Sequence, residues 1–108
     1  MRANLALLAF GGVVLAAQGA WAEAASPARG RELVQAHCAQ CHAVGRADAS
    51  PNPAAPALRN LHLFLDVDSL AGPLARGGLV GHPKTAPYAF SAGEAADVVA
   101  DLRSLQTR

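Results

Sequence analysis

The sequence Cys38-Ala39-Gln40-Cys41-His42 places two thiols three positions apart, with an imidazole directly after the second. This C-x-x-C-H spacing is the attachment signature of a c-type haem. The thiols of Cys38 and Cys41 can add to the two vinyl groups of one porphyrin, and His42 can then bind its iron. The chain contains only these two cysteines. We therefore predict one covalent haem c, attached through Cys38 and Cys41, with His42 as an iron ligand.

Three other interpretations of the cysteine pair are less well supported. A thioredoxin-like C-x-x-C needs a βαβ context, and no parallel-strand pattern surrounds this motif. A zinc site would take both cysteines and two histidines, but His42 directly follows Cys41 and cannot easily join the same tetrahedron. A plain structural disulfide between Cys38 and Cys41 is the simplest alternative.

The segments on either side of the motif predict helices and a long loop. Ser26 and Pro27 are typical of a helix start, so a first helix is expected to lead into Cys38. Three prolines within six residues make 45–56 a loop. The stretch 58–65 is expected to form a short helix or packed turn, and a further helix should follow to about Arg76, before Gly77.

The last helix has the clearest local signals. Ser91-Ala92-Gly93-Glu94 matches a capping box. The expected apolar face then follows at helical spacing and consists of Ala95, Val98, Val99, Leu102 and Leu105. No strand pattern is present, so the sequence predicts an all-α domain.

Over residues 26–107 the chain resembles class I c-type cytochromes, the small monohaem bacterial cytochromes c. The resemblance implies a bundle of three to four helices with long loops wrapped around one haem. Gly30 matches a family glycine that lets the first and last helices cross closely. Ala55-Pro56-Ala57-Leu58 resembles the family's P-x-L segment, in which the proline carbonyl accepts a hydrogen bond from the proximal histidine. Pro56 is therefore expected to orient His42.

The methionine that usually completes iron coordination in this family is replaced. The only methionine is Met1, and Thr85 aligns with the family's ligand position. Three outcomes remain open: His82 binds the iron from a loop rich in glycine and proline, Lys84 binds as a neutral amine, or the distal side is open or water-bound.

Three further residues have less specific expectations. His37 is expected at the surface at the end of the first helix, and His62 as a half-buried packing residue. Asp101 stands where the family has an aromatic residue in the last helix. It could pair with Arg103, Arg31 or Arg29 near the surface, and we expect a less stable helix contact, by about 1–3 kcal/mol for the lost apolar burial.

The N-terminus predicts a secretory signal peptide over residues 1–22. Arg2 precedes an apolar run over 5–17, and Ala20-Trp21-Ala22 gives an A-x-A cleavage site. The mature domain would then be 23–108, in the periplasm, with no stable membrane span. It carries eight basic and eight acidic residues, so nothing indicates nucleic-acid binding.

These features predict a monomeric, periplasmic monohaem c-type cytochrome. It would carry single electrons between other redox proteins and would not be an enzyme. The alternative is a haem protein with an open or weakly ligated distal site that binds a diatomic gas or another small ligand.

Overall fold

The computed structural model describes residues 3, 9, 11, 12, 24–79, 81, 82 and 88–106. Within these residues the chain is all-α, as predicted, and contains no strand. The helices are the α-helices α1 (Pro27–His37), α2 (Ala71–Arg76) and α3 (Ala92–Leu105) and the 3₁₀-helices η1 (Leu58–Leu63) and η2 (Val67–Leu70). Apart from four isolated positions, the predicted signal peptide lies outside the described residues. No described helix is long and apolar enough to cross a membrane.

Local sequence signals explain where most helices begin and end. The Ser26 side chain caps α1 by accepting a hydrogen bond from the Arg29 backbone, and the predicted capping box of Ser91 and Glu94 begins α3. Asp66 caps η2, and Gly77 ends α2 with a positive φ of 68°. Glycine adopts this left-handed conformation without a steric penalty.

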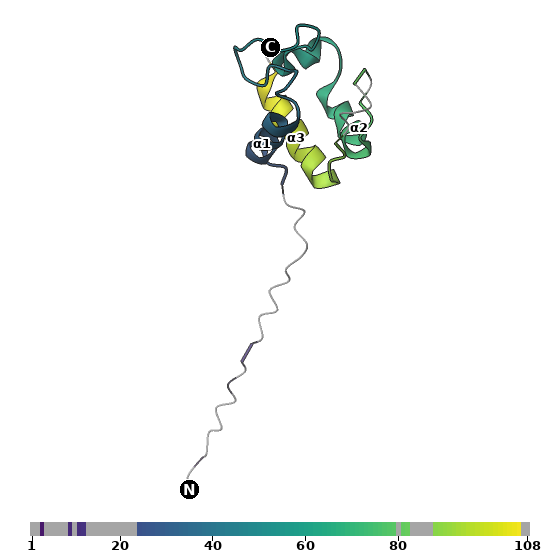
Figure 1. Cartoon of the computed structure of the whole chain (residues 1–108). Coiled ribbons are helices and arrows are strands. Elements are labelled where there is room, and N and C mark those ends of the chain that lie inside the picture. Colours follow the sequence, from purple (N-terminus) through teal and green to yellow (C-terminus); the bar gives the residue numbers. More distant parts are fainter. Residues whose placement is uncertain are drawn as a thin grey trace.

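Helix α3 is the central element of the fold, because α1, α2, η1 and η2 all contact it. Figure 1 shows α1 crossing α3, and it shows α2 lying near the end at which α3 begins. The crossing occurs at Gly30, where an added Cβ would lie 2.5 Å from the carbonyl carbon of Asp97 and would overlap with its oxygen. The prediction that Gly30 permits a close helix crossing is therefore confirmed.

Asp97 fastens the start of α1 to the middle of α3. Its carboxylate accepts hydrogen bonds from the Ser26 backbone N–H at 2.7 Å and from Arg29 Nε at 3.1 Å. These two donors lower the pKa of Asp97. The contact therefore stabilises the fold above the carboxyl's ordinary pKa, and its contribution is lost as the pH falls through the lowered folded-state value.

The core is one apolar cluster, and the C-x-x-C-H motif lies at its edge. Its buried members come from every helix and from the segment before α3: Val34, Leu58, Leu61, Val67, Leu74, Phe90, Ala95, Val98, Val99 and Leu102. Cys38 packs against this cluster from the end of α1. The first cysteine of the motif is thus held by the same packing that joins α1 to α3.

Candidate functional site

The motif Cys38–His42 forms a tight turn at the end of α1. Cys38 is the C-cap of that helix, and its carbonyl accepts hydrogen bonds from the Cys41 N–H at 3.2 Å and the His42 N–H at 2.9 Å. Cys38 and His42 are half-buried, whereas Cys41 is exposed. The turn therefore brings both thiols and the imidazole into one short segment at the edge of the core.

The ring of His42 is fixed by the loop that follows it. Its Nδ1 lies 2.6 Å from the carbonyl oxygen of Pro56. Because a carbonyl only accepts, Nδ1 must carry the proton and donate it. The backbone of Leu58 donates to Ala43 O at 3.0 Å, which holds the loop against the motif. This hydrogen bond leaves Nε2 as the ring nitrogen of His42 that can bind a metal ion.

The state of the cysteines bears on the alternatives to a haem. Cys38 and Cys41 are free thiols, so the fold holds no disulfide between them. Burial, and secondarily the Asp101 carboxylate, raise the pKa of Cys38 to about 11. A thioredoxin-like cysteine needs a lowered pKa. Among the described residues, no group of three or more His, Cys, Asp or Glu side chains is placed to hold a metal ion, so zinc has no ligand set there.

The same residues do fit a haem c. Two free thiols on one turn are the groups that thioether attachment needs, and Nδ1 of the adjacent imidazole is hydrogen-bonded to a backbone carbonyl. Such a partner fixes the orientation of a metal-binding histidine and raises its basicity. The donor set of Cys38, Cys41 and His42, with Pro56 behind it, is therefore suited to one covalently held iron porphyrin.

The remaining histidines occupy three different environments. The His82 ring lies opposite His42, with ring centroids 5.9 Å apart and planes 24° from parallel. His37 is exposed, as expected, but it stacks on Tyr88 with centroids 4.0 Å apart and meets Phe90 edge-on. This aromatic group was not anticipated from the sequence. Lys84 and Thr85, the other two residues considered for the distal side, lie outside the described residues.

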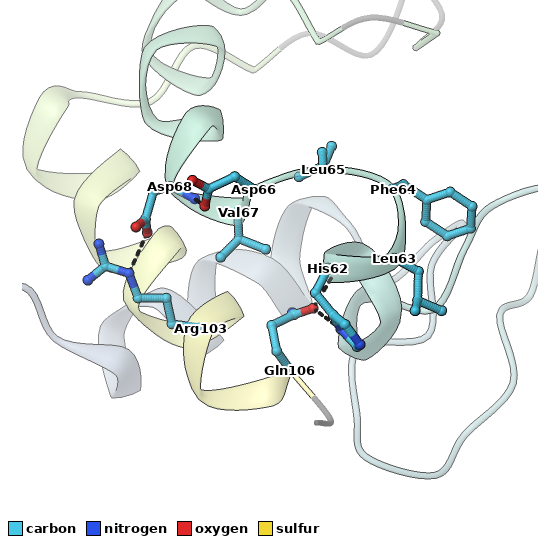
Figure 2. Close-up of a pocket in the computed structure, with 9 residues that line it drawn as sticks. All are labelled: His62, Leu63, Phe64, Leu65, Asp66, Val67, Asp68, Arg103 and Gln106. Atoms are coloured by element: carbon cyan, nitrogen blue, oxygen red, sulfur yellow. Dashed lines mark hydrogen bonds and ion pairs between the residues drawn. The ribbon is translucent and has the colours of Figure 1, made fainter.

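His62 is exposed, so the expectation that it is a half-buried packing residue is wrong. Its backbone N–H donates to Gln106 Oε1 at 2.9 Å, and its Nδ1 lies 2.9 Å from the same oxygen. Figure 2 shows both side chains in a surface pocket between the end of α3 and the segment linking η1 to η2. Neither cysteine nor His42 lines this pocket, so it is separate from the candidate haem site.

The expectation that Asp101 lies near the surface in an arginine pair is wrong. Only 3% of the residue is exposed, and its Oδ2 has no hydrogen-bond partner. Arg29 instead pairs with Asp97, and Arg103 with Asp68. Burial raises the pKa of Asp101, although the charge of Arg31 partly offsets this. The position lies inside the helix contact, which the sequence alone did not indicate.

Replacing Asp101 with asparagine is expected to stabilise the haem-loaded protein at pH 7, by about 1 kcal/mol, because no charge is then buried. With its pKa raised in the folded state, the carboxyl favours folding while protonated, and this contribution is lost as the pH rises. The gain should therefore shrink towards pH 4. Urea unfolding at both pH values measures it, with the exposed Glu32→Gln variant as control. Lower stability of Asp101→Asn at pH 7 would contradict this prediction.

Comparison with known proteins gives one match. Residues 27–106 match the family model described as Cytochrome c. No curated protein and no solved structure matches the chain significantly. The matched region includes the C-x-x-C-H turn, the Pro56 loop and all the described helices.

Proposed function

Because the chain belongs to the cytochrome c family, we propose that it is a monohaem c-type cytochrome that carries single electrons between other redox proteins. Family membership implies a covalently bound haem c and haem-based electron transfer. In this chain, Cys38 and Cys41 would attach the haem, and His42 would bind its iron. The observation that carries the assignment is the 2.6 Å contact of His42 Nδ1 with Pro56 O, directly beside two free thiols.

Each residue of the site has a distinct physical task. When bound, the haem supplies an iron that gains and loses one electron. Cys38 and Cys41 hold the group to the end of α1, so its position follows the packing of that helix. The Pro56 carbonyl accepts a hydrogen bond from His42 Nδ1, which fixes the orientation of the imidazole and raises its basicity. The chain thus provides attachment, orientation and choice of iron ligand, and the cofactor provides the redox chemistry.

Two further parts of the proposal rest on the sequence. The signal-like segment 1–22, with its A-x-A site ending at Ala22, supports export and cleavage that leave 23–108 as the mature domain. The periplasm is the compartment we propose, and a monomer the working state. The mature segment has equal numbers of basic and acidic residues, so its charge does not indicate a particular redox partner.

Electrochemistry of the exported, haem-loaded protein tests the proposed function. We expect one reversible wave with the width of a one-electron couple, since one C-x-x-C-H motif attaches one haem. The same protein should also exchange electrons with a second, purified c-type cytochrome in stopped-flow mixing. A protein that contains haem but shows no reversible wave and no exchange would contradict the role of electron carrier.

A further inference from the structure

The imidazole rings of His42 and His82 lie near each other, with planes 24° from parallel, and their centroid separation is compatible with one metal ion between them. An imidazole nitrogen binds such an ion at about 2 Å, so two nitrogens on opposite sides stand about 4 Å apart. Each ring centroid lies farther out than its nitrogen. The observed centroid separation is 5.9 Å, whereas the directly stacked rings of His37 and Tyr88 are 4.0 Å apart. The histidine pair is therefore spaced more widely than rings in direct contact.

The backbone before His82 places its ring at this position. Leu79 packs against the core, and Gly81 turns the chain with a positive φ of 80°. The turn is closed by the His82 N–H, which donates to Leu79 O at 3.3 Å. Glycine is the residue that adopts such a φ without strain. The turn therefore connects the core directly to a histidine that stands opposite His42.

The described residues after His82, beginning with Tyr88, also lie next to the motif. Tyr88 stacks on His37, which immediately precedes Cys38, and Phe90 is buried in the core with its N–H donating to Leu74 O at 3.1 Å. His82 and Tyr88 therefore both lie beside the C-x-x-C-H turn.

We infer that His82 is the second axial ligand, binding the haem iron on the face opposite His42. This inference rests on the proposed function, because it requires a haem on Cys38 and Cys41. His37 contacts aromatic rings, and His62 contacts Gln106. Two imidazoles give a lower reduction potential than the usual histidine and methionine pair, since the thioether raises it. They also close the iron to small ligands.

Carbon monoxide binding to the reduced, haem-loaded protein tests the inference. We expect the absorption spectrum of the unsubstituted protein to stay unchanged on addition of carbon monoxide. His82→Ala should instead show a large shift of the Soret band, and added imidazole should reverse it. The matched variant His62→Ala removes a histidine outside the site and should behave like the unsubstituted protein.

The possible outcomes test the assignment of His82 and the proposed function separately. A haem-loaded His82→Ala variant with an unchanged spectrum, or an unsubstituted protein that binds carbon monoxide readily, would overturn the assignment of His82 while leaving the cytochrome intact. The second of these results would favour the open distal site. Absence of haem from every variant would overturn the proposed function as well. If His82→Ala does not mature, near-infrared magnetic circular dichroism of the oxidised unsubstituted protein identifies the ligand pair, and any pair other than two imidazoles rejects His82.

Discussion

Replacing Cys38 and Cys41 together with alanine is expected to abolish covalent haem attachment. The two thiols are the only ones in the chain, and both lie on the turn that ends α1. Without them no thioether can form, and His42 alone cannot hold the group under denaturing conditions. Haem staining after denaturing electrophoresis measures the effect, and we expect complete loss of the stained band.

Variants that lack one cysteine, and a matched control that keeps both, show whether the loss of haem is due to the missing thiols. Cys38→Ala and Cys41→Ala should each keep one attachment point and yield less haem-loaded protein with a shifted spectrum. The control changes Ala39 and Gln40, the two positions between the cysteines, to serine and alanine respectively. It should retain haem, because those positions supply no thiol. Haem that stays with the double cysteine variant would show that attachment occurs elsewhere.

Replacing Gly30 with alanine is expected to destabilise the domain strongly, although alanine favours helices more than glycine does. The added Cβ would overlap with the Asp97 carbonyl, which belongs to the α3 backbone and cannot rotate away as a side chain can. Forcing α1 and α3 apart should lower the free energy of unfolding by about 3 kcal/mol. Urea unfolding of the haem-loaded protein, followed by far-ultraviolet circular dichroism, measures this change.

Gly93 provides the control for Gly30. It also lies in a helix, but an added Cβ there would meet nothing within 4 Å. Gly93→Ala should therefore change the free energy of unfolding by no more than about 1 kcal/mol, and in the stabilising direction. Equal effects of the two substitutions would mean that the close crossing at Gly30 does not limit stability.

Features encoded by neighbouring residues were predicted well from the sequence. Ser26 with Pro27, Ser91 with Glu94, and Gly77 each act within one helical turn, so their residue types indicate helix ends directly. The C-x-x-C-H motif is equally local. Gly30 was a different case, because its contact with Asp97 joins distant segments and was predicted only through the family resemblance.

Features that depend on distant packing were not predicted. Asp97 and Asp101 lie four positions apart, on the part of α3 that faces the core. This spacing, which places both on one face of a helix, was the sequence signal that could have indicated their burial. Whether such carboxyls reach solvent depends on how α1 crosses α3, so the surface pairing expected for Asp101 was wrong. The position of the His82 ring near His42 likewise depends on the turn at Gly81, and the sequence could not distinguish His82 from the other candidate ligands.

The most direct test of the haem assignment is the intact mass of the exported protein under denaturing conditions. We expect the mass of the chain from Glu23 to Arg108 plus one haem, because we propose that the signal segment is removed and that two thioethers form, and thioethers survive denaturation. A protein of the same chain mass with no added haem, whether Cys38 and Cys41 are thiols or a disulfide, would contradict the assignment of a c-type cytochrome.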